Sequence, residues 1–205
     1  YIGNQLMRAL LAEGHQIHTI LRDLSKRNRV ELPGVQAFKG DLTDAPSILK
    51  AMEGCEQVFH TAAYAKLWAE SPGIFYETNV RGTYNVLSAA AATGVQKVVY
   101  TSSAGVLGNS VRSPLTEDDP RISGLSNDYD LSKAMAEQLV RDFANDRMNA
   151  VIVNPTRVYG GGTMSYSNAI SRMLIEFLNR KNSSVPGCMD VVANYSYIHD
   201  VVSGH

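Results

Sequence analysis

Short apolar stretches alternate with longer stretches of helical periodicity, and this alternation constrains the fold more than any other feature of the chain. Strands separated by helices in this rhythm favour right-handed crossover connections and a parallel sheet that helices cover on both faces. We therefore predict an α/β fold with a doubly wound parallel sheet. Strands are expected at residues 16–21, 35–39, 57–61, 97–101 and 150–153, and helices at 4–13, 46–52, 75–92 and 130–143.

The composition is that of an ordinary globular protein. Of the 205 residues, 44% are hydrophobic and the formal charge is −1, which indicates neither nucleic acid nor a membrane surface as a partner. No apolar run reaches the roughly 18 residues that a membrane span needs. Cys55 and Cys188 lie far apart without metal-ligand spacing, so we expect idle thiols, no metal site and a reducing, cytoplasmic location. Because the chain opens at Tyr1 without methionine and ends at His205, we interpret it as an internal fragment, which leaves a removed leader peptide open.

Tyr129 and Lys133 are the first candidate catalytic pair. They lie four residues apart in the predicted 130–143 helix region, so their side chains share one face. A neighbouring ammonium favours phenolate, and we expect it to lower the pKa of the tyrosine from about 10 toward neutrality. Such a phenol can give or take the proton when a carbonyl and an alcohol interconvert. The alternative is an ordinary exposed helix face.

Residues that follow each strand are the next candidates, because parallel sheets bind ligands beyond the carboxyl ends of their strands. Ser103 follows the 97–101 strand, where a hydroxyl can hydrogen-bond a substrate oxygen as charge develops on it. The alternative is that Ser102 and Ser103 only form a turn.

Other strand ends predict a dinucleotide cofactor. Gly3 precedes the first helix, as the last glycine of a dinucleotide-binding turn does. Arg22 follows the 16–21 strand and could pair with a 2′-phosphate, which favours NADP. The neighbouring Asp23 leaves NAD open. An equal alternative is that Arg22 belongs to a solvated basic loop with Lys26 and Arg27.

Residues that follow two further predicted strands also lie where a cofactor is expected to bind. Asp41 could accept the adenine amino group while Leu42 packs on the ring, or Asp41 could simply cap a turn. Small residues after the 57–61 strand would let a flat cofactor lie against the backbone, and these are Thr61, Ala62 and Ala63. His60 is interpreted as a hydrogen-bonded core residue without a catalytic role.

Together these segments resemble the extended short-chain dehydrogenase/reductase family over the whole chain. The motifs are Gly40-Asp41-Leu42, His60-Thr61-Ala62-Ala63, Asn79-Val80-Arg81-Gly82-Thr83-Tyr84-Asn85, Tyr100-Thr101-Ser102-Ser103-Ala104, the Tyr129/Lys133 pair, Asn154-Pro155-Thr156-Arg157-Val158-Tyr159-Gly160 and Tyr197-Ile198-His199-Asp200-Val201-Val202. Arg22 and the stretch Tyr64-Ala65-Lys66-Leu67-Trp68-Ala69 are similar to the dihydroflavonol-reductase-like branch, which includes farnesol-dehydrogenase-like proteins.

The resemblance implies roles for individual residues. Ser103 would polarise the substrate oxygen, Tyr129 would donate or accept the proton, and Lys133 would hold the nicotinamide ribose. Asn79 would be a structural or proton-relay residue. Pro155 and Val158 would line the nicotinamide side.

The resemblance also implies a domain organisation. Residues 1–160 would form a Rossmann-type dinucleotide-binding domain that lacks its first, central strand and the pyrophosphate site. Residues 161–205 would begin a smaller substrate lobe, with one late strand returning to the sheet. Such a fragment is expected neither to fold well nor to bind cofactor. A homodimer formed through the helices at 75–92 and 129–143 is a further implication.

Three functions stay open at this stage. The leading one is an NADP(H)- or NAD(H)-dependent oxidoreductase that interconverts a carbonyl and an alcohol on a mid-sized, partly apolar substrate, with Tyr64 and Trp68 as its apolar wall. The second is a nucleotide-sugar epimerase or dehydratase that keeps its NAD; no carboxylate follows Ser103, which counts against a dehydratase. The third is a cofactor-binding protein without turnover, against which the presence of both Tyr129 and Lys133 counts.

Overall fold

The strands of the protein are short and pair in parallel. The structure, a computed structural model, describes residues 1–25, 32–110, 113–121, 123–125, 127–144, 148–163, 168–179 and 192–205. Every strand pairing in these ranges is parallel, which confirms the predicted α/β class. The strands are β1 (Ile17–Leu21), β2 (Val35–Lys39), β3 (Gln57–His60), β4 (Lys97–Thr101), β5 (Asn149–Val153), β6 (Arg157–Tyr159) and β7 (Tyr195–Tyr197).

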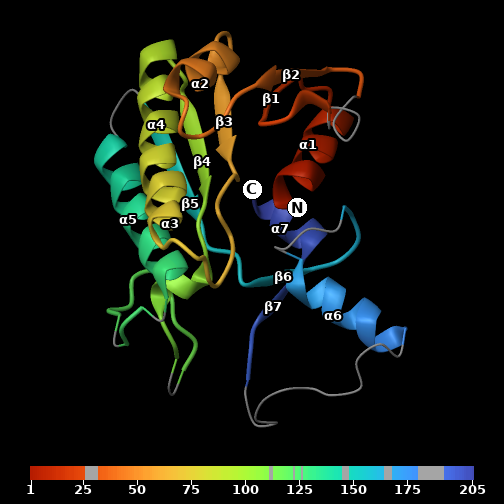
Figure 1. Ribbon diagram of the computed structural model, residues 1–205, viewed down its shortest axis with the longest axis vertical. Coiled ribbons are helices and arrows are strands. Elements are labelled where there is room, and N and C mark those ends of the chain that lie inside the picture. Colours follow the sequence, from red (N-terminus) through yellow and green to blue (C-terminus); the bar gives the residue numbers. More distant parts are fainter. Residues whose placement is uncertain are drawn as a thin grey trace.

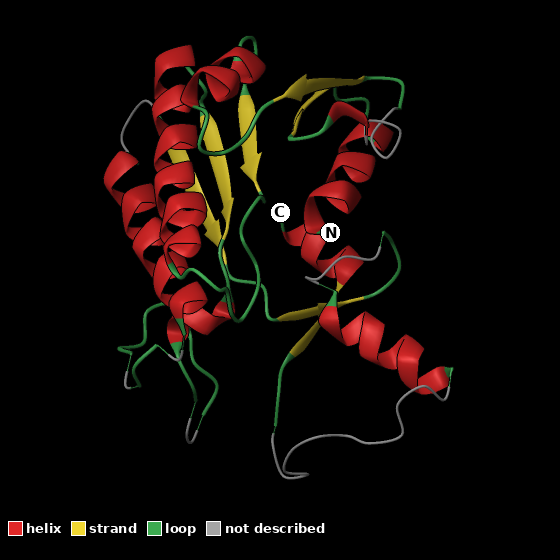
Figure 2. Cartoon of the chain, in the orientation of Figure 1, coloured by secondary structure: helices red, strands yellow, loops and turns green. Residues whose placement is uncertain are grey.

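Helices connect these strands (Figure 2). The predicted 75–92 helix is a composite of α3 (Gly73–Phe75), a π-helical segment η2 (Tyr76–Arg81) and α4 (Gly82–Thr93). A 3₁₀ turn, η3 (Ala104–Leu107), follows β4. The remaining helices are α1 (Ile2–Ala12), α2 (Ala45–Met52), α5 (Asp128–Phe143), α6 (Ala169–Leu178) and α7 (Ile198–Gly204).

The main sheet has the order β3-β4-β5 and is covered by helices on one side (Figure 1). Helices α2, α4 and α5 pack in a row against this side, and α1 packs with α7 elsewhere. The core between the sheet and the helices includes Val98, Tyr100, Leu87 and Val140, each at most 5% exposed. Their burial fixes α5 against β4, so the first turns of α5 lie beside the carboxyl end of that strand.

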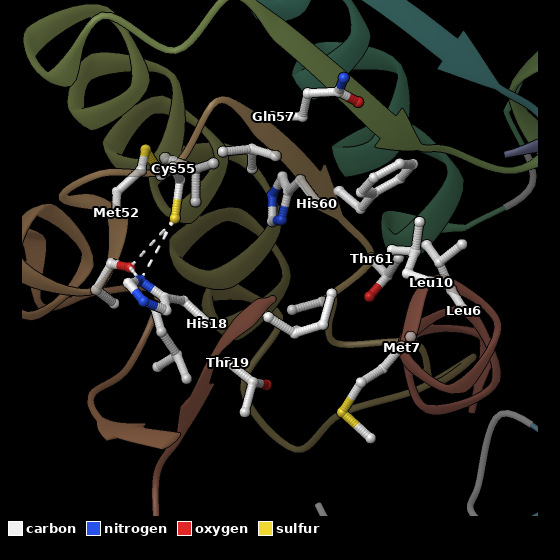
Figure 3. A pocket seen from close by; sticks show the side chains of 18 of the residues that line it. Leu6, Met7, Leu10, His18, Thr19, Met52, Cys55, Gln57, His60 and Thr61 are labelled. Carbon is white, nitrogen blue, oxygen red and sulfur yellow. Dashed lines mark hydrogen bonds between the residues drawn. The ribbon is translucent and has the colours of Figure 1, made fainter. Parts of the chain in front are cut away.

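The β1-β2 pair is separate from the main sheet. In the part of the chain that the structure describes, β1 pairs only with β2 and the outer edge of β3 has no partner strand. A cavity of about 610 Å³ lies between these elements and α1. Figure 3 shows Leu6 and Leu10 of α1, His18 of β1 and His60 of β3 around it.

The late strand differs from the prediction that it returns to the main sheet. Residues Tyr195–Tyr197 form β7, which pairs with β6 in a separate two-stranded sheet. Gly160 explains part of this arrangement, because it has φ 137° and lies directly against Ile198, where a side chain would leave no space.

Candidate active site

Ser103 and Tyr129 lie together at the carboxyl end of β4. The Ser103 hydroxyl lies near enough to the Tyr129 phenol to influence the pKa of that phenol. Ser103 caps η3, since the Gly105 amide donates to its Oγ at 3.1 Å. Asn127 caps α5 in the same way and sets where that helix begins, because its side chain accepts from the Asp130 amide at 2.9 Å. The two caps therefore bring the Ser103 hydroxyl and the Tyr129 phenol to the same end of the sheet.

Lys133 lies one turn further along α5, and its side chain is buried. The residue is 1% exposed, its Nζ donates to the Thr101 carbonyl at 2.7 Å, and the same atom lies 4.1 Å from the centre of the Tyr100 ring. The strand thus supplies both a carbonyl acceptor and an aromatic face for the ammonium. The structure therefore brings three of the predicted catalytic residues, Ser103, Tyr129 and Lys133, to one place.

The expected effect of Lys133 on the pKa of Tyr129 is wrong in this structure. Burial, together with the neighbouring Asp130 carboxylate, raises the pKa of Tyr129 to about 12, although the nearby Ser103 hydroxyl opposes the rise. Burial also lowers the pKa of Lys133 to about 7, against the opposing charge of Glu137. The sequence pattern showed the spacing of Tyr129 and Lys133 but not that both side chains are buried. Burial disfavours the charged form of each group, so it raises the pKa of the phenol and lowers that of the ammonium.

Asn79 lies in the π-helical segment η2 and is 2% exposed. Its Oδ1 accepts from the Tyr64 amide at 2.7 Å, and its Nδ2 donates to the Tyr64 carbonyl at 3.4 Å and to Ser132 Oγ at 2.9 Å. Ser132 Oγ donates in turn to the Tyr129 carbonyl at 2.8 Å. Asn79 therefore joins the loop after β3 to the turn of α5 that carries Tyr129, which is a positioning arrangement.

Four of the predicted cofactor residues line the cavity beside β3. They are Gly3, Leu42, Thr61 and Ala62, and Ala63 follows them in the chain. A side chain at Gly3 would collide with Thr61, so α1 can approach the end of β3 only because residue 3 is glycine. Ser103, Tyr129 and Lys133 do not line this cavity.

Arg22 and Asp41 meet at the ends of β1 and β2. Arg22 Nε lies 3.9 Å from Asp41 Oδ2, and the Arg22 side chain is 85% exposed. Hydrogen bonds from the Thr43 amide and hydroxyl lower the pKa of Asp41, and the Arg22 charge adds to this effect. Asp41 is thus a turn cap that also faces Arg22. Lys26 and Arg27 lie outside the described residues.

The other predicted positions have structural contacts. The Pro155 carbonyl accepts from the Ala104 amide at 3.0 Å, next to Ser103. Val158 is buried in a small cluster with Ile198 and Val201. His60 is the expected core residue: its Nε2 lies 3.0 Å from Thr83 Oγ1, and complete burial lowers its pKa to about 3.

Two contacts at the site were not anticipated from the sequence. The Glu137 side chain is 6% exposed, although a glutamate is normally a surface residue. Its Oε1 accepts from Asn154 Nδ2 at 2.7 Å, and the same Nδ2 lies 3.3 Å from the Ser103 carbonyl. The signal was present in the spacing, because Tyr129, Lys133 and Glu137 are successive members of one i, i+4 row.

The loop after β3 exposes apolar side chains. Trp68 is 75% exposed and Leu67 is 81% exposed. Tyr64, by contrast, packs edge-on against Phe75 with ring centres 5.1 Å apart. None of the described helices is long and apolar enough to cross a bilayer, and the described residues contain no cluster of potential metal ligands.

Comparison with known proteins assigns the family. The model of the NAD dependent epimerase/dehydratase family matches residues 1–205. The chain belongs to this family. A Synechocystis sp. protein named "Putative dihydroflavonol 4-reductase" is 31% identical over 208 residues, which cover 100% of this chain and 59% of that protein. Anthocyanidin reductase of Arabidopsis thaliana is 28% identical, over 100% of this chain and 68% of the relative.

The fold is Rossmann-like, as a solved structure also shows. UDP-glucose 4-epimerase of Thermus thermophilus, in complex with NAD, superposes with a TM-score of 0.83 at 24% identity and covers 100% of this chain and 70% of that chain. The chain spans about three fifths of the length of the first of these relatives.

The residues of the site fit a nicotinamide dinucleotide. Gly3 lets the start of α1 lie directly against Thr61, and small residues continue along the chain at Ala62 and Ala63. Lys133 supplies a buried donor beside the Ser103 and Tyr129 hydroxyls. These are the donor types that ribose hydroxyls and a carbonyl oxygen accept from.

Proposed function

We propose that the protein is an NAD(P)-dependent oxidoreductase that interconverts a carbonyl and an alcohol on a mid-sized, partly apolar substrate. The observation that carries the proposal is the proximity of the Ser103 hydroxyl to the Tyr129 phenol, with Lys133 buried one turn away on the same helix face. Relatives named as reductases support the same class of reaction.

Each residue of this group has a separate task in the proposal. Ser103 donates a hydrogen bond to the substrate oxygen and holds it beside the Tyr129 phenol. Tyr129 transfers its proton to that oxygen during reduction and takes it back during oxidation. Lys133 holds the nicotinamide ribose. The bound nicotinamide would supply the hydride to the substrate carbon, or accept it in the reverse direction.

The pKa of Tyr129 favours reduction near neutral pH. With a pKa of about 12, the phenol is protonated at pH 7 and is ready to donate. Oxidation of the alcohol needs phenolate as the base, so that direction should become faster as the pH rises.

For the cofactor we propose NADP. Arg22 is exposed at the end of β1 and could pair with a 2′-phosphate, while Asp41 and Leu42 would contact the adenine and Gly3, Thr61, Ala62 and Ala63 would pack along the dinucleotide. Pro155 and Val158 would lie on the nicotinamide side. The ion pair between Arg22 and Asp41 is long and exposed, so it would yield to a phosphate with little penalty.

For the substrate we propose an apolar wall from the loop after β3. Trp68 and Leu67 are exposed side chains on the loop that Asn79 ties to α5. Closing them over an apolar substrate would remove their surface from water. The residues after 160, in the proposed substrate lobe, would contribute further specificity.

The unpaired edges of β1 and β3 support the expected domain organisation. We propose that in the full-length protein a parallel strand fills the cavity between them and completes the sheet of the dinucleotide-binding domain. The exposed apolar residues Tyr84, Leu131 and Met135 of α4 and α5 support a homodimer through these helices.

Net consumption of the reduced cofactor tests the function. Purified full-length protein is mixed with NADPH or NADH and a panel of mid-sized aldehydes and ketones. The loss of the absorbance of the reduced cofactor is followed together with the formation of the alcohol product. We expect stoichiometric oxidation of the cofactor. Isomerisation of a nucleotide sugar without net consumption would instead identify an epimerase, and binding without turnover a non-catalytic protein.

A further inference from the structure

Glu137 is a buried carboxylate that the proposed mechanism does not use. Its side chain is 6% exposed, one helical turn beyond Lys133 and two beyond Tyr129. A carboxylate in such a place needs partners, because an unpaired buried charge is strongly unfavourable. Asn154 Nδ2 donates to its Oε1 at 2.7 Å and Arg141 donates to its Oε2 at 3.0 Å.

The Asn154 amide connects this carboxylate to the substrate side of the site. Asn154 follows β5, and its Nδ2 also lies 3.3 Å from the Ser103 carbonyl. The Ser103 segment is further tied to the residues after β5, because the Ala104 amide donates to the Pro155 carbonyl. Glu137 therefore orients an amide that holds the backbone of the residue proposed to polarise the substrate.

Resting on the function proposed above, we propose that Glu137 is a positioning residue with two effects. Through Asn154 it fixes the backbone at Ser103, and through its charge it keeps the buried Lys133 ammonium protonated so that this group can hold the nicotinamide ribose.

The surroundings of Lys133 explain why a counter-charge is needed. The groups that face it are the Tyr100 ring and the Thr101 carbonyl of β4, and His60 of β3, whose own pKa falls further because of the Lys133 charge. His60 is neutral near pH 7, and so is Tyr100, whose pKa burial raises. On α5 itself, Tyr129 is protonated at pH 7, and Glu137 supplies the negative charge that raises the pKa of Lys133.

The test compares four variants of the full-length protein. In Glu137→Gln the amide oxygen can still accept from Asn154 but the charge is lost. The affinity for NADPH, measured by fluorescence across pH, should begin its alkaline decline about one pH unit lower than in the wild type. In Asn154→Ala the charge stays, so the decline should keep its position while kcat for carbonyl reduction falls about tenfold or more.

Glu77→Gln is the matched control, since it removes the same charge from an exposed pair with Arg81 on η2. It should leave both the pH of the decline and kcat at their wild-type values. Arg141→Gln is a further variant, at a half-exposed position. It removes the ion-pair partner of Glu137, so the alkaline decline of NADPH affinity should move to higher pH.

If the alkaline decline of NADPH affinity began at the wild-type pH in Glu137→Gln or in Arg141→Gln, the electrostatic half of the proposal would be overturned. A wild-type kcat in Asn154→Ala would overturn the proposal that Glu137 fixes the backbone at Ser103 through Asn154. Because cofactor binding is measured apart from turnover, a protein that binds NADPH but reduces no carbonyl would sink the proposed function and still decide the electrostatic role of Glu137.

Discussion

Asn79 Nδ2 donates a hydrogen bond of 2.9 Å to Ser132 Oγ, and the Ser132 hydroxyl donates onward to the carbonyl of Tyr129. The other contacts of the Asn79 amide are to both backbone groups of Tyr64. One side chain in a π-helical segment therefore aligns the loop after β3 with the turn of α5 that carries Tyr129. π-helical segments occur frequently at functional sites, and this one places the amide between the two elements.

Replacing Asn79 with alanine should loosen this alignment. The buried hydrogen bonds are lost together, so the free energy of unfolding should fall by about 1–3 kcal/mol. Tyr129 would lose its fixed position, and kcat for carbonyl reduction should fall more than the affinity for cofactor. Denaturant unfolding and steady-state kinetics measure the two effects.

Asn85→Ala is a suitable control for that variant. Asn85 donates to the Leu42 carbonyl at 2.8 Å from the neighbouring helix α4, away from Tyr129. It should lose stability without a loss of kcat. Equal kcat values in the Asn79 variant and the wild type would contradict the positioning role.

Lys133 should make the stability of the protein rise with pH above neutrality. Its pKa is about 7 in the folded state and 10.5 in the unfolded chain, so between these values the unfolded chain binds more protons. Stability should therefore increase from about pH 7 to pH 10, by an amount on the order of a few kcal/mol. Above pH 10 it should fall, because the pKa of Tyr129 is raised to about 12 on folding.

Lys133→Met isolates this effect. The variant keeps an apolar side chain of similar length, so it should be more stable than the wild type at pH 7 and should lack the rise toward pH 10, while its activity is lost. Urea unfolding at pH 6 to 10 checks it. A rise of the same size in both proteins would show that other groups cause the dependence.

His60 should contribute to instability in acid. Its pKa falls from 6.5 to about 3 on folding because it is completely buried, so the unfolded chain binds more protons between these values and stability is lost as the pH falls through them. Thr83 Oγ1 donates to the Asn79 carbonyl, which leaves it as the acceptor from a protonated Nε2 of a neutral His60. Nitrogen NMR of labelled protein should show that tautomer with no titration from pH 7 to 5; titration near pH 6.5 would contradict it.

Arg22 should decide the choice of cofactor. Removing a cation that pairs with a 2′-phosphate loses a charge-assisted hydrogen bond, so Arg22→Ala should weaken NADPH binding by about 10- to 100-fold and leave NADH binding nearly unchanged. Arg8→Ala, on the exposed face of α1, removes the same charge elsewhere and should change neither affinity. Equal weakening of NADPH and NADH binding in the Arg22 variant would show that Arg22 does not read the phosphate.

The secondary structure and the common face of Tyr129 and Lys133 could be predicted from hydrophobic periodicity and from residue spacing. The alternation of strands and helices predicted β1 to β5, α2 and α5 with ends within about two residues of those observed, because burial on a parallel sheet imposes both periods. The spacing of Tyr129 and Lys133 likewise predicted their common face. Ser103 could be placed beside them because parallel strands end at one edge of the sheet.

Burial and pairing partners could not be deduced in the same way. A polar helix face is normally exposed, and only the packing of α5 against β4 and β5 shows that Lys133 and Glu137 are enclosed. The direction of the Tyr129 pKa follows from this desolvation, which spacing does not reveal. The three-residue strand β7 is too short for its period to specify a partner, so its pairing with β6 depends on contacts around Gly160.

The most direct measurement of the central claim is the activity of Tyr129→Phe. The variant keeps the ring but lacks the hydroxyl that lies near Ser103, so the proposed proton donor is removed. We predict that kcat for carbonyl reduction falls by about 10²- to 10⁴-fold while the NADPH dissociation constant stays within about twofold of the wild type. Full activity in Tyr129→Phe would contradict the mechanism.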